Sequence, residues 1–270
     1  MRQGVSVPNF GEFFNPRVVA ELAKEAERAG WDGFFTWDHI LPWSSAAVAD
    51  PWITLSAVAL STERIKIGPM VTPLARRRPW KVAREAVTLD HLSGGRLILG
   101  VGLGFPPDRE FGTFGEETGD RVRAEKLDEA LAIVDGMLSG EAFEFSGKHF
   151  QVGREVFLPR PVQRPRIPVW VAGMWPGRAP FRRAARWDGV FPIDAGTGGA
   201  AFSPEALGEV VEEMNKLRGN LDGFEVVAPL MQGRAAAEYQ AAGATWVISG
   251  PTLEGGLAEL RPRIAAGPPR

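Results

Sequence analysis

The chain has 270 residues, of which 44% are hydrophobic and 24% charged, with a formal net charge of −2 and no cysteine. The balanced charge argues against nucleic acid or an anionic membrane as a partner. The absence of cysteine excludes disulfides, iron–sulfur clusters, thiolate zinc sites and cysteine nucleophiles. No apolar run reaches the roughly 20 residues of a spanning helix, and Met1–Gln3 does not open a signal peptide. We therefore expect a cytoplasmic protein.

Short apolar runs alternate with amphipathic stretches along the chain. The expected strand and helix ranges are, in order, 4–8 and 16–29, 33–37 and 51–61, 65–68 and 80–92, 96–101 and 121–138, 168–172 and 178–186, 188–193 and 204–217, 224–229 and 235–241, and 245–249 and 254–264. Repeated strand-then-helix units imply a parallel sheet. Eight of them in about 250 residues predict a single (β/α)8 TIM barrel domain over residues 1–270. An open doubly wound sheet is the structural rival.

Residues 141–168 interrupt this rhythm. FEFSGKHFQV, residues 143–152, contains two alternating runs around Ser146-Gly147, which predicts an inserted hairpin. The proline-rich stretch 159–168 then predicts an extended connector that returns to the barrel.

In a barrel of this kind, functional side chains lie at the C-terminal ends of the strands. The expected strand ends are Asn9 and Phe10, Asp38 and His39 with Trp43 beyond, GPMVTP (68–73), GVGLGF (100–105) and AGMWPGR (172–178). They are rich in glycine and aromatic residues and poor in charge, which suits a flat heteroaromatic cofactor better than a sugar or a metal. The remaining histidines, His91 and His149, are expected to be structural or on the surface, so no metal site is predicted.

The run Arg64–Gly104 resembles the core signature of the bacterial luciferase-like flavin and deazaflavin oxidoreductases. GWDGFFTWDHILPW, residues 30–43, is similar to the second strand of this family, and residues 165–178 and 185–192 resemble its fifth and sixth strands. The resemblance covers most of residues 5–191 and is loose in the last third. It implies a (β/α)8 barrel that holds reduced coenzyme F-420 or FMN. Members of this family are commonly dimers, so a homodimer stays open.

By this resemblance, His39 and Trp43 line the cofactor and are the candidate catalytic residues. An imidazole there can donate a hydrogen bond or a proton near neutral pH; the alternative is a histidine satisfied by a neighbour at the barrel mouth. Adjacent strand residues point to opposite faces, so Asp38 is expected to fix a backbone or loop instead of sharing one atom with His39. The predicted cofactor contacts are Asp38, His39, Met70, Val71, Thr72, Gly102, Gly104, Gly173, Met174 and Arg178. The predicted substrate pocket comprises Asn9, Phe10, Phe105 and Trp175.

Two further backbone features follow from the same resemblance, and one charge feature is read from the residues themselves. The third strand of the family ends in a bulge with a non-prolyl cis peptide, which falls here at Met70–Val71, with Gly68–Pro69 as the alternative. The stretch 172–178 resembles the phosphate loop of the family, where Arg178 adds a charge-assisted bond. The arginine run 76–78 is either a solvated loop or a rim of charge for the anionic tail of the cofactor.

The leading interpretation is an oxidoreductase that uses reduced coenzyme F-420 to transfer hydride to an apolar conjugated small molecule. The alternative is an FMN-dependent monooxygenase, because FMN can form an oxygen adduct and the deazaflavin carries hydride only. Sugar-phosphate dehydrogenases of the deazaflavin branch have acids at strands 1 and 4, where this chain has Asn9-Phe10 and Phe105, so sugar dehydrogenation is not expected. A non-catalytic cofactor-binding barrel is a further hypothesis. A hydrolase would need paired carboxylates, and only Asp38, Asp108 and Asp194 stand as candidates, with no evident pair.

Overall fold

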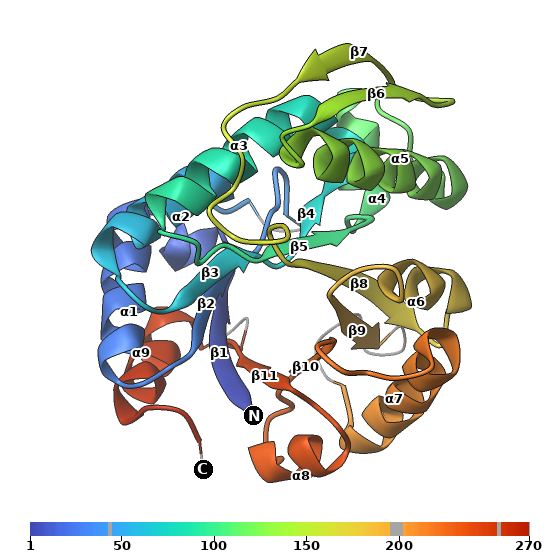
Figure 1. The fold of residues 1–270 in the computed structure, drawn as a ribbon. Coiled ribbons are helices and arrows are strands. Elements are labelled where there is room, and N and C mark those ends of the chain that lie inside the picture. The colour runs from blue at the N-terminus through green and yellow to red at the C-terminus, as the bar shows by residue number, and fades with distance from the viewer. Residues whose placement is uncertain (43–44, 195–201, 253–254, 270) are drawn as a thin grey trace.

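The computed structural model describes residues 1–42, 45–194, 202–252 and 255–269. Their parallel strands curve into a barrel that is surrounded by helices (Figure 1). The barrel strands are β1 (Arg2–Val7), β2 (Gly33–Thr36), β3 (Lys66–Pro69), β4 (Thr72–Pro73), β5 (Leu99–Gly102), β8 (Val169–Trp175), β9 (Gly189–Asp194), β10 (Glu225–Pro229) and β11 (Trp246–Ser249). This arrangement confirms the predicted (β/α)8 barrel and rules out the open doubly wound sheet.

The ring closes because β3 and β4 are two halves of one interrupted strand. They stand at opposite ends of the sheet order β3-β2-β1-β11-β10-β9-β8-β5-β4, so the nine strands within the described residues occupy eight positions. The Ile98 N–H donates to the Ile67 carbonyl at 2.8 Å, and the Ile67 N–H donates to the Arg96 carbonyl at 3.1 Å. Past the interruption, β4 pairs with β5. The third strand therefore contacts β2 with its first half and the fourth strand with both halves.

Each of the eight strand positions is followed by a helix, as the alternating pattern predicts. The helices are α1 (Pro16–Arg28), α2 (Pro51–Ser61), α3 (Pro79–Leu92), α5 (Asp120–Leu138), α6 (Arg178–Ala184), α7 (Pro204–Arg218), α8 (Ala236–Ala241) and α9 (Gly256–Ala266), and the short elements are α4 (Pro107–Glu110), η1 (Gly11–Phe13), η2 (Leu74–Arg76) and η3 (Gly112–Phe114). Asn15, Asp50 and Ser203 each accept a backbone hydrogen bond at a helix start, and proline follows each of them. No helix of the described ranges is long and apolar enough to cross a membrane.

The predicted insertion forms an antiparallel hairpin outside the barrel, with strands β6 (Ala142–Ser146) and β7 (Gln151–Val156) (Figure 1). The Glu129 carboxylate on α5 accepts backbone hydrogen bonds from Lys148 at 2.7 Å and from His149 and Phe150 at 3.0 Å each. Three backbone donors on one carboxylate fix the turn of the hairpin on α5.

The barrel encloses its own apolar cluster, separate from the layer between strands and helices. This interior cluster consists of Phe35, Met70, Ile98, Trp170, Val227, Trp246 and Ile248. The rings of Trp170 and Trp246 meet edge-on with centroids 5.3 Å apart, and Phe35 packs against both. Val71 and Phe191, which are partly exposed, pack on this cluster. The barrel is thus filled by side chains, and its functional surface is its end.

One buried arginine joins the second, third and fourth strand–helix units. Arg96 is 7% exposed. Its guanidinium donates to the carbonyls of Ala59 and Thr62 at the end of α2, to the Ile65 carbonyl before β3, and to the Ser93 carbonyl after α3, at 2.6–3.1 Å. A cation is also favoured by the partial negative charge at a helix C-terminus. Arg96 therefore satisfies carbonyl groups that the ends of two helices leave without partners.

We expect Arg96→Ala to lower the free energy of unfolding by about 3 kcal/mol, because buried carbonyls lose a charged donor. Urea denaturation measures this difference. Arg121→Ala is the matched control: the Arg121 side chain is 89% exposed, and its loss should change stability by less than about 0.5 kcal/mol. Equal effects of the two substitutions would contradict the role given to Arg96.

Candidate active site

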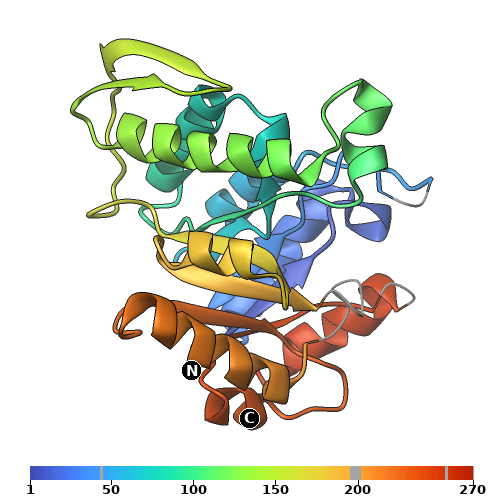
Figure 2. The same ribbon diagram turned by 90° about the vertical axis from the view of Figure 1, so that its right-hand side faces the viewer.

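The C-terminal ends of the barrel strands open onto one end of the molecule, which we call the mouth. Figure 2 shows the strands running toward this end, with η1, the loop after β2 and the α4–η3 segment beyond them. Functional side chains of a barrel of this type lie here.

His39 stands at the mouth immediately after β2. Its ring lies edge-on to Phe10 and Trp37, with centroids 5.8 and 6.1 Å away, and its Nδ1 lies 3.0 Å from Oε1 of Glu110. The Asn9 amide accepts from the His39 N–H at 3.1 Å and donates to the His39 carbonyl at 2.8 Å. The side chain of His39 is 16% exposed. The imidazole is therefore fixed in place yet reachable from the mouth.

Glu110, the last residue of α4, holds the loop that carries His39. Besides His39, one carboxylate oxygen accepts the Leu41 N–H at 3.1 Å; the other accepts the Ile40 N–H at 3.0 Å and contacts the Arg76 guanidinium. Burial alone would raise the pKa of Glu110. Hydrogen bonds from His39 and Ile40 and the charge of Arg76 outweigh burial and leave the pKa below the ordinary 4.5. Glu110 is therefore ionised at neutral pH.

Asp38 is fully buried and is held by donors from the third strand and the segment after it. Thr72 Oγ1 donates to Oδ2 at 2.9 Å, and Arg77 donates to both carboxylate oxygens at 2.9 and 3.0 Å. Arg76 donates to Oδ1 at 2.5 Å and to the Asp38 carbonyl at 2.8 Å. These bonds tie the end of β2 to β4 and η2. Asp38 has the loop-fixing position expected for it, and its contact with a cofactor stays a prediction.

Two carboxylates and two guanidinium groups thus form one neutral cluster under the mouth. The side chains of Asp38, Glu110 and Arg76 are at most 3% exposed, and that of Arg77 is 18% exposed. The idea that this arginine run offers charge to an anionic tail is wrong for Arg76 and Arg77, because both guanidinium groups neutralise buried carboxylates. Arg78, the third member of the run, is exposed.

The third strand carries the predicted backbone feature. The Met70–Val71 peptide is cis, and Gly68–Pro69 is not among the cis bonds of the described chain. Val71 packs on the interior cluster and is partly exposed. A Cβ on Gly102 would lie 2.7 Å from a methyl carbon of Val71. Gly102 therefore makes room for Val71, which places an aliphatic side chain at the floor of the mouth.

The fifth strand departs from its predicted form. β8 extends to Trp175, so most of the predicted phosphate loop, 172–178, is strand, followed by a short link to α6. The Trp175 ring lies edge-on to Phe181 with centroids 5.0 Å apart, and its Nε1 lies 3.3 Å from Oε2 of Glu209 on α7. Trp175 therefore contacts the helix layer. Arg178, the first residue of α6, is exposed.

The sequence-predicted site residues divide by their exposure. Buried are Asn9, Phe10, Asp38, Met70, Thr72, Gly102 and Gly173; partly exposed are His39, Val71, Gly104, Met174 and Trp175; exposed are Phe105 and Arg178. Trp43 lies outside the described residues. The amide of Asn9 is used by backbone groups of His39 and Ala49, so it positions the loop. Contact of each of these residues with a cofactor or substrate stays a prediction.

Sequence reasoning missed Glu110. The carboxylates considered at strand ends were Asp38, Asp108 and Asp194, although Glu110 also follows the fourth strand, where the barrel rule places functional groups. Asp38 and Glu110 do form a pair through Arg76, which the sequence did not reveal. Both are buried, so they fix loops and do not present the open acid and base of a hydrolase.

The other histidines lie outside the mouth, as expected. The Nε2 of His91 lies 2.7 Å from the Arg160 carbonyl, and the Nε2 of His149 lies 2.9 Å from Glu125. Both bonds fasten the inserted hairpin or its connector to a helix. Within the part of the chain that the structure describes, no three His, Asp or Glu residues are grouped to hold a metal ion.

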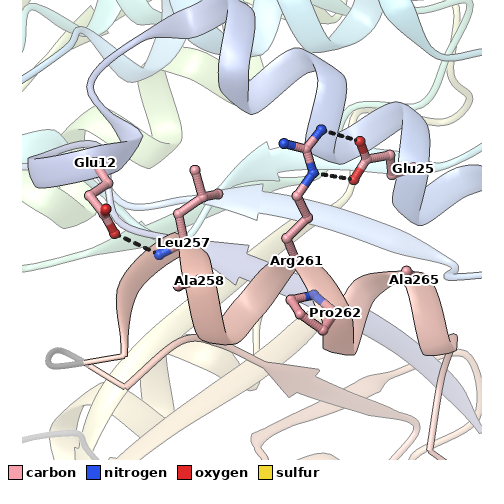
Figure 3. A pocket seen from close by; sticks show the side chains of 7 residues that line it. All are labelled: Glu12, Glu25, Leu257, Ala258, Arg261, Pro262 and Ala265. Carbon is pink, nitrogen blue, oxygen red and sulfur yellow. Dashed lines mark hydrogen bonds and ion pairs between the residues drawn. The ribbon is translucent and has the colours of Figure 1, made fainter.

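A groove of about 570 Å3 lies outside the barrel between η1, α1 and α9 (Figure 3). It is lined by Glu12, Glu25, Leu257, Ala258, Arg261, Pro262 and Ala265. Arg261 donates to both oxygens of Glu25, at 3.0 and 2.5 Å, and Glu12 accepts the Leu257 N–H at 2.7 Å. The polar groups of the groove are used in these contacts, and no sequence-predicted site residue lines it. We therefore place the candidate active site at the mouth.

Comparison with known proteins identifies the family of the chain. A model of the luciferase-like monooxygenase family matches residues 1–263. The chain belongs to this family. Among curated proteins, it is 31% identical over 205 residues to the F420-dependent glucose-6-phosphate dehydrogenase of Amycolatopsis mediterranei, covering 74% of this chain and 60% of that protein. The chain thus spans about three fifths of the length of such curated relatives.

Solved structures share the fold over nearly the whole chain. An F420-dependent secondary alcohol dehydrogenase in complex with an F420-acetone adduct aligns with a TM-score of 0.78 at 19% identity, covering 98% of both chains. A monooxygenase from Streptomyces bottropensis aligns with a TM-score of 0.72 at 23% identity, covering 98% of this chain and 82% of that chain. At these identities the likeness establishes the barrel architecture.

We expect Arg76→Ala to lower the free energy of unfolding by about 3–5 kcal/mol. The substitution leaves the buried Glu110 carboxylate without its guanidinium partner and leaves Asp38 with Arg77 as its remaining arginine. Arg78→Ala, from the same arginine run, should change stability by less than about 0.5 kcal/mol, because Arg78 is exposed. Parallel urea denaturation of both variants measures the contrast. A loss in Arg76→Ala no larger than that in Arg78→Ala would show that the charge cluster is not a structural necessity.

Lowering the pH should reduce the contribution of Glu110 to the stability of the fold. Because folding lowers its pKa below 4.5, its contribution to stability is full above that pH and is lost as pH falls through the folded-state pKa. The stability difference between wild type and Glu110→Gln should therefore shrink between neutral pH and about pH 3. Urea denaturation at both pH values tests this, and a difference that does not change with pH would contradict it.

Proposed function

We propose that the chain binds reduced coenzyme F-420 at the mouth and transfers hydride to an apolar conjugated small molecule. The observation that carries the proposal is His39, a partly exposed imidazole at a strand end, flanked by aromatic rings and bound through Nδ1 to Glu110. The family match and the curated relatives that are named as F420-dependent support this cofactor.

The residues at the mouth fit a flat heteroaromatic group. Val71 and Phe191 lie partly exposed on the interior cluster and provide an apolar floor, while His39 adds one polar group at the edge. When bound, the reduced coenzyme supplies a hydride to a substrate carbon. His39 then supplies the proton that the neighbouring substrate atom requires. Phe10 and Trp37, which pack on its ring, help to exclude water from this transfer.

The rim of the mouth favours an apolar substrate. Phe14, Ile40, Phe105 and Phe114 are 47–54% exposed and follow the first, second and fourth strands. Exposed apolar groups gathered around a site mark a surface that binds apolar ligands. The charge cluster beneath is neutral, so it adds no net field to attract a phosphate. We therefore propose a conjugated apolar acceptor in preference to a sugar phosphate.

FMN is the second candidate cofactor, since the family is one of monooxygenases. The same floor and the same imidazole would serve an isoalloxazine ring. FMN would change the reaction to oxygenation of the substrate.

The test is a titration of the purified chain with coenzyme F-420 and with FMN at low salt, followed by absorbance. We expect the deazaflavin to bind more tightly. His39→Ala should weaken binding or abolish turnover with only a modest shift in melting temperature, because the imidazole lies at the mouth and not in the core. His149→Ala, in the hairpin, is the matched histidine control and should bind as the wild type does. If FMN binds tightly and F-420 binding is undetectable, the F-420 proposal is refuted and the monooxygenase alternative replaces it.

A further inference from the structure

Trp37 follows the last residue of β2 and extends the barrel wall toward the mouth. Its N–H donates to the Val7 carbonyl at 2.9 Å, so the pairing of β2 with β1 continues through it. Phe35, two residues earlier, belongs to the interior cluster. Because side chains alternate between the two faces of a strand, Trp37 also faces the inside of the barrel, one layer closer to the mouth.

The hydrogen bond of the indole agrees with this direction. The indole N–H donates to Ser6 Oγ at 3.1 Å, and Ser6 lies beside Phe35 in the sheet. Two residues before Ser6, a Cβ on Gly4 would lie 2.9 and 3.0 Å from side-chain carbons of Ile248 and Phe35, which both belong to the interior cluster. Position 4 therefore faces inward, and position 6 does so too, which places the Trp37 ring on the inner side of the wall.

This location sets Trp37 apart from the other tryptophans that the structure describes. Three of them are not buried, namely Trp37, Trp80 and Trp175. Trp175 contacts the helix layer through Phe181, and Trp80 on α3 lies edge-on to Phe150 beside the hairpin. Of these three, Trp37 is the one that is exposed toward the mouth.

Trp37 stands at the level where the third strand is interrupted. Thr36 pairs with Pro69, and the Met70 N–H donates to the Thr36 carbonyl at 2.7 Å. Val71 follows, partly exposed on the interior cluster. The indole of Trp37 and the aliphatic side chain of Val71 thus lie on neighbouring strands at one height. Together they form a floor with an aromatic half and an aliphatic half.

The indole is held at its edges and its donor is already used. Phe10 and His39 pack edge-on against it, with centroids 5.9 and 6.1 Å away and interplanar angles of 63° in both cases. Ser6 accepts the N–H, which is the one polar group of the side chain. A ligand in the mouth can therefore contact the ring system of Trp37 but gains no hydrogen bond from it. Because the orientation of the ring is fixed in advance, binding costs little side-chain entropy.

We propose that Trp37 is a specificity-determining residue, whose indole contacts the flat heteroaromatic ring of the ligand at the mouth. The proposal deepens the function proposed above and rests on it for the class of ligand. Contacts between aromatic rings add to the gain from burying apolar area, and a saturated sugar ring has no π system to take part in them. Trp37 therefore selects for a planar ring, whether that ring is a deazaflavin or a flavin.

The experiment compares three variants of the full chain by titration with coenzyme F-420 and with FMN. Trp37→Leu keeps an apolar side chain but removes the ring. We expect it to raise the dissociation constant of either cofactor that binds by about 5- to 100-fold, as when a base loses the aromatic side chain on which it stacks. Trp37→Phe keeps a ring and should lose less. Trp80→Leu is the matched control: Trp80 is 39% exposed on α3, and its loss should change the dissociation constant by about twofold at most.

Ligands without a tail separate contact with the ring from an indirect effect. Riboflavin has the ring of FMN without its phosphate, and a deazaflavin analogue without phosphate and tail is the counterpart for coenzyme F-420. Trp37→Leu should weaken each ring compound by the same factor as its parent cofactor. A loss of affinity confined to the phosphorylated cofactor, or a loss no larger than that in Trp80→Leu, would overturn the proposal.

A measurement on the wild-type chain tests the contact even if Trp37→Leu does not fold. The nine tryptophans give nine indole N–H signals in a nitrogen-15 correlation spectrum, and Trp37→Phe identifies the signal of Trp37. The ring current of a bound heteroaromatic ring should shift the Trp37 signal at saturation and leave the Trp80 signal in place. A Trp37 signal that does not move while the ligand is bound would refute the proposal.

The outcomes also separate this inference from the proposed function. FMN binding that weakens in Trp37→Leu, without any F-420 binding, would support the role of Trp37 and refute the proposed cofactor. Coenzyme F-420 turnover with equal affinity in wild type and Trp37→Leu would support the proposed function and refute the role of Trp37. A chain that binds neither cofactor and neither ring compound would refute both.

Discussion

The mouth of this barrel depends on the guanidinium of Arg76, which lies between two buried carboxylates that arrive from different strand ends. Asp38 and Glu110 would each be costly to bury as a lone anion. Arg76 contacts both, and Arg77 supplies the second positive charge. The cluster joins the loops after the second, third and fourth strands into one unit. The orientation of the His39 ring therefore depends on ion pairs that the burial of these two carboxylates requires.

In this arrangement, neighbouring atoms of the same side chain contact different parts of the mouth. One oxygen of Glu110 contacts Arg76 and the Ile40 N–H, whereas the other contacts the His39 ring. The apolar groups are divided in a similar way, since Val71 both covers the interior cluster and forms the floor of the mouth. Substitutions at exposed rim positions such as Phe105 should accordingly disturb the fold less than substitutions of the residues beneath them.

The sequence predicted the barrel because apolar strands alternate with helical stretches along the chain, and in three of the units a capping residue, Asn15, Asp50 or Ser203, stands before a proline at the helix start. It also placed His39 and the cis Met70–Val71 peptide, through resemblance to a family. It could not predict the charge cluster, because Arg76 and Arg77 read as a solvated loop until their partners are known. Those partners lie far away in sequence, and burial, which decides between solvent and ion pair, is a property of the tertiary structure.

The pairing of the first strand with the last has a consequence for how the molecule is made. Arg2 lies beside Trp246 in the sheet, so β1 receives its second neighbour only after the residues of β11 have left the ribosome. Until then β1 and β10 are open edges, able to pair with other chains. Contacts between segments so distant in sequence also slow folding. During synthesis, the unfinished barrel is therefore the state most exposed to aggregation, and the arrival of β11 removes both vulnerable edges at once.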